Sequence, residues 1–361
     1  MNTNSTKVLM ISRDSNALRS DSEVYARLLK YSTLFELYVV VVGKVTKSNF
    51  NNENNLKIYN STSRFKLVAL TKSLMIAFRV GQTIKGDNLF VSSQDPFEAG
   101  LVSLVISKLL RAKLQIQIHT DCFDPYFRKH SVRNFFHYVL ARIIIPQADI
   151  LRVVSSKIEA DVLELCKGIK PPKIVVLPIL HDIKRVEGGG VLKSKFGNFT
   201  KLVLVVARLE KEKNLSLALL AFQKLLRLYP GIGLIVVGDG REKDWLIKYT
   251  RHLGISESVV CMGWVDNASN LMIEADLLLV TSFYEGYGMT IVEALSNNCP
   301  VVSVPVGIAP DSGAVIAGYD AGEIALRGVE LLRDGSKGEL NPNLKMSEGE
   351  YLDKYKETFI I

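Results

Sequence analysis

The sequence predicts an α/β protein built from two doubly wound domains. Its 361 residues are too many for one ordinary core and suit two domains of roughly 150–200 residues each. Short runs rich in Val, Ile and Leu recur, and several are followed by an amphipathic pattern. A polar, glycine-rich stretch interrupts this alternation once. Near-continuous apolar strands are typical of parallel sheets that helices cover on both faces.

The first half of the chain contains six apolar runs of strand length. They predict strands at residues 7–12, 35–42, 88–93, 114–120, 150–155 and 173–178. Long amphipathic segments between them, such as 65–84 and 96–110, predict helices. Together these elements predict a first doubly wound domain over residues 1–185.

A second domain follows a predicted linker. Residues 181–200, HDIKRVEGGGVLKSKFGNFT, are polar and lack periodicity. The alternation then restarts, with strands expected at 201–209, 232–240, 258–264, 275–282 and 300–305 and helices at 215–229, 242–253, 289–297 and 321–332. These predict a domain over 186–340. The amphipathic run 347–360 predicts a closing helix in 341–361 that crosses back to the first domain.

The composition is that of a globular cytoplasmic protein, with 48% hydrophobic and 23% charged residues. The four cysteines are scattered and form neither a CxxC pair nor a zinc motif: Cys122, Cys166, Cys261 and Cys299. The N-terminal residues lack the apolar region of a signal peptide. No apolar run approaches the roughly 20 residues of a membrane span.

Positive charge is concentrated in the first half. Residues 1–190 contain 27 Lys and Arg and 16 Asp and Glu, a net of +11, whereas residues 191–361 have 18 and 21, a net of −3. Two basic segments, 63–85 and 124–146, are also apolar; the second contains Arg128, Lys129, Arg133 and Arg142 with Phe127, Phe135, Phe136 and Tyr138. Such helices can lie on an anionic membrane surface. The alternatives are ordinary sheet-covering helices and a basic surface that only aids solubility.

The segment EGYGMTIVEAL, residues 285–295, is the first candidate site. Glu285 follows a predicted strand, and two glycines allow a tight turn before a helix that starts near Met289. The free N–H groups of that helix start, with the Thr290 hydroxyl, suit an anion. Glu293, about one turn into the helix, suits the hydroxyls of a ribose. The alternative is a plain helix start with favourably placed acids.

Two further turns follow predicted strands. In VARLEKEKNL, Arg208 and Lys213 suit a diphosphate, although the loop can also be an ordinary solvated one. In VVGDGRE, Gly238 lies in a phosphate-type turn that lacks the third glycine of a dinucleotide fingerprint. The first strand-to-helix turn, residues 10–27, has no glycine, which argues against a nicotinamide enzyme.

Together these motifs resemble the GT4 family of retaining glycosyltransferases. EGYGMTIVEAL is similar to the family's E-x7-E motif, VARLEKEKNL to its strand-end Arg and following Lys, and VVGDG to its next strand and turn. The resemblance covers about residues 200–310. It implies the GT-B fold, two Rossmann-like domains that face a cleft. It also implies transfer of a sugar from a UDP- or GDP-sugar to an acceptor hydroxyl, with no metal required.

The resemblance also implies roles for individual residues. Arg208 and Lys213 would bind the donor diphosphate and assist its departure, Glu293 would bind the ribose, and Glu285 the sugar hydroxyls. Other donor-binding residues would be Gly238, Trp264, Val265, Tyr287, Gly288, Met289 and Thr290.

In the first domain, which the resemblance makes the acceptor-binding one, His119 is similar to the histidine that many members place in the cleft. Arg13 and Asp121 are acceptor-side candidates. The glycine-free first loop departs from the family pattern. We expect a glycan or polyprenyl-linked acceptor from surface polysaccharide synthesis, on the inner face of the plasma membrane, and no nucleic acid. The alternatives are a nucleotide-sugar epimerase and a non-enzymatic basic module that binds membrane or nucleic acid.

Overall fold

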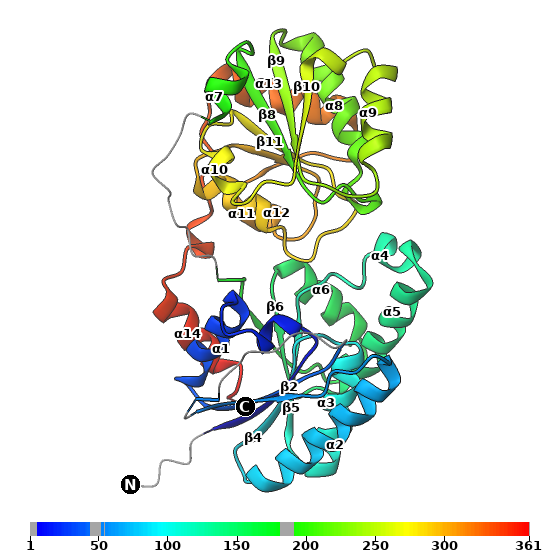
Figure 1. Cartoon of the computed structure of the whole chain (residues 1–361), viewed down its shortest axis with the longest axis vertical. Helices are drawn as coiled ribbons and strands as arrows, with labels where there is room; N and C mark the ends of the chain where they lie inside the picture. Colours follow the sequence, from blue (N-terminus) through cyan, green and yellow to red (C-terminus); the bar gives the residue numbers. More distant parts are fainter. Residues whose placement is uncertain (1–5, 44–51, 54, 181–190, 361) are drawn as a thin grey trace. The chain divides into compact units, whose positions relative to one another are not determined.

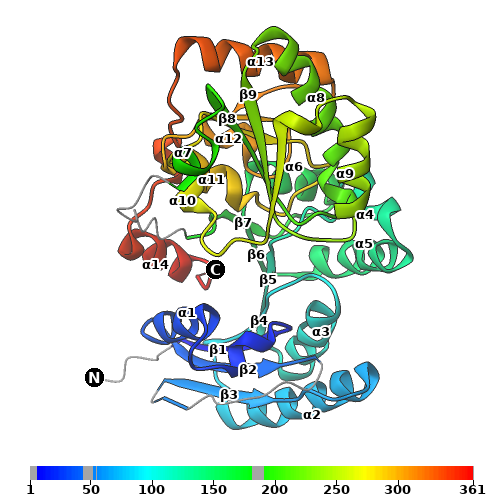
Figure 2. The same cartoon turned by 45° about the horizontal axis from the view of Figure 1, so that its top comes forward.

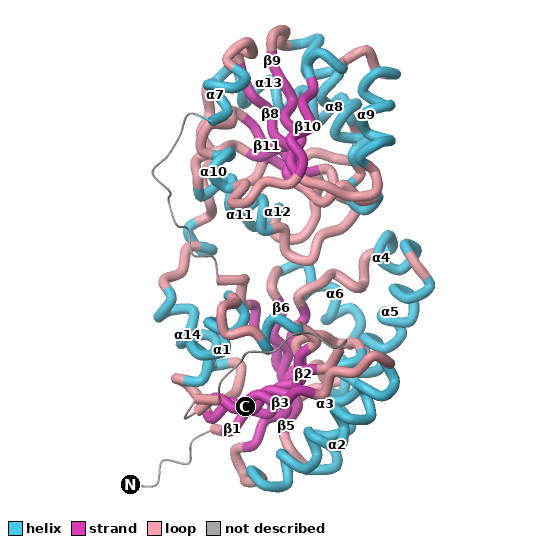
Figure 3. The backbone as a smooth tube through the Cα atoms, in the orientation of Figure 1, coloured by secondary structure: helices cyan, strands magenta, loops and turns pink. Residues whose placement is uncertain are grey.

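A computed structural model of the chain describes residues 6–43, 52–53, 55–180 and 191–360 (Figure 1). The chain divides into two compact units. The N-terminal unit comprises Met1–Pro178 and Met346–Ile361, and the C-terminal unit comprises Ile179–Lys345. Within each unit, strands form a central sheet with helices around it (Figure 3).

The N-terminal unit has a seven-stranded parallel sheet with the order β3-β2-β1-β4-β5-β6-β7. The strands are β1 (Lys7–Ser12), β2 (Glu36–Val41), β3 (Leu56–Asn60), β4 (Leu89–Ser93), β5 (Lys113–Ile118), β6 (Ile150–Val153) and β7 (Lys173–Val176). β1 pairs with β2 on one side and with β4 on the other. The strand order therefore reverses between β1 and β4.

Helices cover both faces of this sheet. They are α1 (Glu23–Ser32), α2 (Lys66–Ile84), α3 (Glu98–Leu110), α4 (Pro125–His130), α5 (Val132–Ile144), α6 (Ser156–Leu165) and α14 (Glu348–Glu357). α2, α3 and α5 pack in that order on one face, and α1 and α14 lie on the other (Figure 2). The ring of Tyr355 in α14 stacks on Tyr31 of α1, with centroids 4.0 Å apart. The last helix is thus part of the N-terminal core.

The C-terminal unit has a six-stranded parallel sheet with the order β10-β9-β8-β11-β12-β13. The strands are β8 (Lys201–Val206), β9 (Ile232–Val237), β10 (Val259–Gly263), β11 (Leu277–Val280), β12 (Val301–Ser303) and β13 (Val315–Ile316). The helices of four or more residues are α7 (Val191–Phe196), α8 (Leu215–Leu228), α9 (Lys243–His252), α10 (Ser269–Met272), α11 (Met289–Ser296), α12 (Ala309–Ser312) and α13 (Ala321–Asp334). Here the order reverses between β8 and β11.

The predicted fold class is confirmed: both sheets are parallel and Rossmann-like. Two short edge strands, β3 and β13, were not predicted. The predicted linker is wrong in part, because α7 lies inside it; its residues 181–190 lie outside the described part of the chain. By length and composition one described helix, α2, is apolar enough to cross a membrane, although no run of that length was expected.

Candidate active site

The C-terminal unit collects its candidate residues at one edge of its sheet. Because the strands are parallel, their carboxyl ends share that edge, and ligands of such sheets bind where the strand order reverses. Arg208 follows β8 and Glu285 follows β11, the two strands on either side of the reversal. Gly238 follows β9 and Trp264 follows β10. The four motifs of the sequence therefore meet at the place where this fold binds ligands.

An ion pair bridges the two strands at the reversal. Lys213 Nζ lies 2.6 Å from Glu285 Oε1, and their side chains are only 14% and 15% exposed. The Ser282 hydroxyl donates to the same carboxylate oxygen at 2.6 Å. The Thr281 hydroxyl donates to the backbone carbonyl of Lys213 at 3.2 Å. The loops after β8 and β11 thus hold a cation and a carboxylate in fixed positions.

Arg208 has more freedom than Lys213. Its side chain is 68% exposed, and Nη2 lies 3.1 Å from Oε1 of Glu212, which the sequence did not single out. Water screens the exposed guanidinium and weakens this pair. A guanidinium has five N–H donors, so Arg208 has others to offer to a further anion.

The turn into α11 presents backbone donors. Gly288 has φ +96°, a conformation that favours glycine, and no side chain caps the helix start that follows it. The first N–H groups of α11, from Met289 and Thr290 onward, are thus left for another acceptor. Ile308 N donates to the carbonyl of Tyr287 at 2.7 Å. This hydrogen bond joins the backbone that follows β12 to the turn before α11.

Glu293 lies one turn into α11 and is half-buried. Burial raises the pKa of its carboxyl group above the ordinary value of 4.5, and a hydrogen bond with Ser269 offsets part of that rise. On the loop after β10, Trp264 is 71% exposed and Val265 is half-buried. An exposed aromatic ring at the carboxyl edge of the sheet is free to stack on a planar group.

Gly238 is explained by packing. With φ +133°, its missing Cβ would lie 1.9 Å from the carbonyl oxygen of Ala207. Its N–H donates to the carbonyl of Gly263 at 2.8 Å. Only glycine lets the ends of the neighbouring strands come this close. The phosphate role expected from the VVGDG motif is therefore not needed to explain this residue.

In the N-terminal unit, His119 follows β5. Burial, together with the positive charges of Arg152 and Arg27, lowers the pKa of this imidazole from 6.5 to about 3. It is neutral throughout the physiological range. A neutral ring can donate from one nitrogen and accept at the other.

The other two N-terminal candidates are held in ion pairs. Arg13 Nη1 lies 2.5 Å from Oε2 of Glu98, at the start of α3. Asp121 is 2% exposed and pairs with Lys157 of α6. The sequence motifs did not identify Glu98 and Lys157 as partners of these residues. The pairs are 85 and 36 positions apart in the chain, beyond the reach of a local motif.

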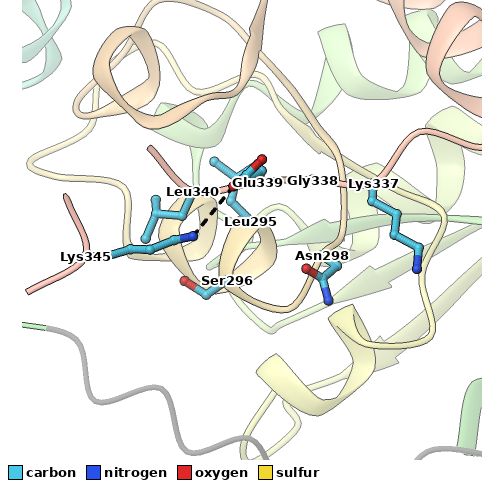
Figure 4. A pocket seen from close by; sticks show the side chains of 8 residues that line it. All are labelled: Leu295, Ser296, Asn298, Lys337, Gly338, Glu339, Leu340 and Lys345. Atoms are coloured by element: carbon cyan, nitrogen blue, oxygen red, sulfur yellow. Dashed lines mark ion pairs between the residues drawn. The ribbon is translucent and has the colours of Figure 1, made fainter. Parts of the chain in front are cut away.

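A pocket of the C-terminal unit does not coincide with the candidate site. It has a volume of about 520 Å³ and lies where α11 ends, away from the carboxyl edge of the sheet (Figure 4). Its lining residues are Leu295, Ser296, Asn298, Lys337, Gly338, Glu339, Leu340 and Lys345. None of the predicted site residues belongs to this set. Among the described residues, no group of three or more His, Cys, Asp or Glu side chains could hold a metal ion.

The two parallel, Rossmann-like sheets are those expected of a GT-B fold. The family model described as "Glycosyl transferases group 1" matches residues 193–340. This segment therefore matches the family that the motifs predicted, the GT4 glycosyltransferases.

Curated relatives agree with this family. The chain is 26% identical over 204 residues to N-acetylgalactosamine-N,N'-diacetylbacillosaminyl-diphospho-undecaprenol 4-alpha-N-acetylgalactosaminyltransferase of Campylobacter jejuni, covering 55% of this chain and 53% of that protein. It is 27% identical over 263 residues to alpha-monoglucosyldiacylglycerol synthase of Streptococcus pneumoniae, covering 66% and 56%. The chain thus spans little more than half the length of these two relatives.

Solved structures share the fold over almost the whole chain. Anabaena HepE in complex with UDP has a TM-score of 0.69 at 16% identity, covering 98% of this chain and 94% of that one. The lipopolysaccharide outer core galactosyltransferase WaaB has a TM-score of 0.68 at 17% identity, covering 98% and 99%. At these identities the likeness concerns the fold alone.

Proposed function

We propose that this chain transfers a sugar, with retention of anomeric configuration, from a UDP-sugar to an acceptor hydroxyl. The observation that carries the proposal is the Lys213–Glu285 ion pair at the strand-order reversal of a GT4 chain. In this proposal the Lys213 ammonium would bind the diphosphate, and the Glu285 carboxylate beside it would bind the sugar hydroxyls. The choice of UDP draws on HepE, which was crystallised with UDP.

The donor site would use the carboxyl edge of the C-terminal sheet. Arg208 and Lys213 would neutralise the diphosphate and stabilise its charge as it departs. The N–H groups at the start of α11, near Tyr287–Thr290, would hold phosphate or sugar oxygens. Glu293 would accept hydrogen bonds from the ribose. Trp264 and Val265 would lie beside the base.

The N-terminal unit would serve the acceptor. We assign its neutral His119 to the transfer step, as a contact to the donor sugar or the acceptor hydroxyl. Arg13 and Asp121 are the acceptor-side candidates, although both are engaged in ion pairs in the absence of substrate.

The acceptor is proposed to be lipid-carried, such as a surface polysaccharide intermediate on polyprenyl diphosphate. The names of two similar proteins each contain a lipid: diphospho-undecaprenol in one and diacylglycerol in the other. The net charge of +11 in residues 1–190 suits acceptor phosphates. The proposal places the enzyme on the cytoplasmic face of the plasma membrane.

The first test is thermal unfolding with UDP, GDP and ADP. A nucleotide at about 100 times its dissociation constant stabilises the folded protein by about 2.7 kcal/mol. We expect UDP to raise the midpoint, and Glu293→Ala to weaken UDP binding by about 10- to 100-fold through the loss of a charged hydrogen bond. Glu285→Ala should instead keep UDP binding and lower sugar transfer.

Two results of this test would contradict the assigned donor site. If UDP and UDP-sugars produce no shift, or if both Glu variants retain full binding and transfer, the assigned donor site is wrong. An epimerase would be recognised by a changed sugar on the nucleotide without any acceptor product. A non-enzymatic module would consume no donor at all.

A further inference from the structure

The helix α2 shows an inverted distribution of side-chain size. Its buried side carries mainly small residues, among them Ala69, Ser73 and Ala77. Its outer side exposes Leu67 by 73% and Met75 by 53%. An ordinary sheet-covering helix buries its large apolar side chains. Although Leu70, Leu74 and Ile76 are partly buried against the core, the outer side of α2 thus leaves other large apolar side chains uncovered by the rest of the unit.

The neighbouring helix α3 continues this exposed apolar surface. Leu101, Val105 and Leu109 are spaced four residues apart on one stripe of α3 and are 42%, 38% and 58% exposed. α2 and α3 pack closely: a Cβ on Gly81 would lie 2.2 Å from Cδ1 of Leu110. Both helices cover the same face of the sheet (Figure 2). Their exposed side chains therefore lie on the same side of the unit.

The helix α5 extends the surface beyond α3 and adds aromatic and basic groups. Phe135 is 52% exposed and Phe136 is 60% exposed. The guanidinium groups of Arg128 and Arg142 lie 5.0 and 5.6 Å from the ring centre of Tyr138. Arg142 Nη1 also donates to the Tyr138 hydroxyl at 3.0 Å. Phe127, predicted with this group, is buried.

The surface is basic throughout. α2, α4 and α5 contain no Asp or Glu, and the one acid in α3 is Glu98. That carboxylate is only 11% exposed and pairs with Arg13 and Lys66. Exposed basic residues distributed over the three helices include Lys72, Arg79, Lys108, Arg133 and Arg142.

We propose that the outer sides of α2, α3 and α5, the basic apolar face, dock onto an anionic lipid bilayer. Apolar side chains would enter the headgroup boundary while Lys and Arg contact lipid phosphates. α2 has the length of a spanning helix, but its small-residue side is packed on the sheet, so it would lie along the bilayer surface. This deepens the proposed function, because a lipid-carried acceptor requires the enzyme at that surface.

The charge distribution favours a bilayer, rather than a second copy of the chain, as the partner of the basic apolar face. Two copies joined through this face would bring like charges together, which is unfavourable. Anionic lipids neutralise the charges and at the same time cover the apolar stripes. A nucleic acid would satisfy the charges and leave those stripes in water.

The experiment is flotation of the full chain with two kinds of vesicle: phosphatidylcholine alone, and an equal mixture of phosphatidylcholine and phosphatidylglycerol. The test variant is Leu67→Glu with Phe136→Glu. The matched control is Leu326→Glu, which changes an apolar side chain of α13 that is 57% exposed in the other unit. A second variant, Lys72→Gln with Arg79→Gln, removes charge alone.

We expect binding to the anionic vesicles only, weakened by salt and by about fivefold for each charge removed. The Glu pair should abolish binding, and Leu326→Glu should retain it. Binding to both vesicle types alike, to neither, or equally by all variants would overturn the proposal. So would a dimer that the Glu pair dissociates. UDP-induced stabilisation, measured on the same samples, reports separately whether the donor site is intact.

Discussion

The two units place an ion pair at the same point of their topology. In the N-terminal unit, Arg13 after β1 pairs with Glu98, which follows β4. In the C-terminal unit, Lys213 after β8 pairs with Glu285, which follows β11. Each pair therefore bridges the strands at which the order of its sheet reverses. The shared doubly wound topology determines where such a pair can form.

The surroundings of the two carboxylates differ. Glu98 is contacted by Arg13 and Lys66, and His137 Nε2 lies 3.2 Å from its Oε2. Glu285 has Lys213 and a hydroxyl from Ser282. The C-terminal unit also has the exposed guanidinium of Arg208 nearby. The cations around Glu98 thus all converge on one carboxylate, whereas in the C-terminal unit Lys213 and the largely exposed Arg208 pair with two different ones.

The largest effect that follows from this comparison concerns Lys213. We expect Lys213→Ala to lower sugar transfer by about 10²- to 10³-fold, because removal of one preorganised group that stabilises developing charge typically costs that much. Transfer from a radiolabelled UDP-sugar to a lipid acceptor measures it. Lys211→Ala, in the same short turn but exposed, is the matched control and should stay near wild-type activity. Equal activity in both variants would contradict the assigned role.

The C-terminal unit was the more predictable of the two. Its candidate residues each follow a strand, and parallel strands bring their carboxyl ends to one edge, so local motifs alone place Arg208, Lys213 and Glu285 together. Lys213 and Glu285 are indeed in contact. The role of Gly238 in strand packing could not be predicted, since it depends on the position of Ala207, which directly follows the neighbouring strand β8.

The N-terminal unit was less predictable because its polar groups meet across the chain. Arg152 is 3% exposed on β6 and donates to Gln117 on β5 and to Tyr351 on α14. Tyr351 lies 199 positions from Arg152 in sequence. No periodicity or motif signals such a contact. Arg152 in turn lowers the pKa of His119, so the protonation state of that candidate also escaped prediction.

The second largest expected effect is a decrease in the folding stability of the N-terminal unit in acid. Burial would raise the pKa of Glu98, but His137, Lys66 and Arg13 hold it well below its ordinary value of 4.5. The carboxylate therefore stabilises the N-terminal unit fully above about pH 4.5, and this contribution is lost as the pH falls below that value. We expect a loss on the order of 1–2 kcal/mol between pH 5 and 3. Glu98→Gln should remove this part of the pH dependence.

The two tryptophans allow acid unfolding of the C-terminal unit to be followed separately. Trp245 and Trp264 both belong to the C-terminal unit, so their fluorescence follows that unit alone, whereas far-ultraviolet circular dichroism follows both. In acid, the wild-type dichroism signal should change before the fluorescence, and Glu98→Gln should bring the two curves closer. Coincident curves for the wild type would show that Glu98 does not distinguish the units.

A smaller pH effect is expected on donor binding. Glu293 must be ionised to accept hydrogen bonds from a ribose, and burial raises its pKa above 4.5. UDP affinity should therefore fall as the pH decreases, beginning at a higher pH than for an ordinary glutamate. Calorimetric titrations with UDP across pH 4–7 measure this. The terminal phosphate of UDP also titrates in this range, with a pKa of about 6. Glu293→Gln should therefore lose only the part of the decrease that comes from the carboxyl group, and a decrease identical to that of the wild type would exclude Glu293 as a source.

The smallest expected effect concerns His119. Its pKa, lowered to about 3, keeps the imidazole neutral, so its own ionisation should produce no change in transfer rate between pH 5 and 8. An ordinary histidine would titrate in this interval. The ring signals of His119 in nuclear magnetic resonance should stay constant over the same range. Arg152→Gln removes a nearby positive charge and should move the titration upward in pH, although burial, the first cause of the shift, remains. A wild-type midpoint near 6.5 would contradict this prediction and mean that His119 is solvated and charged in acid.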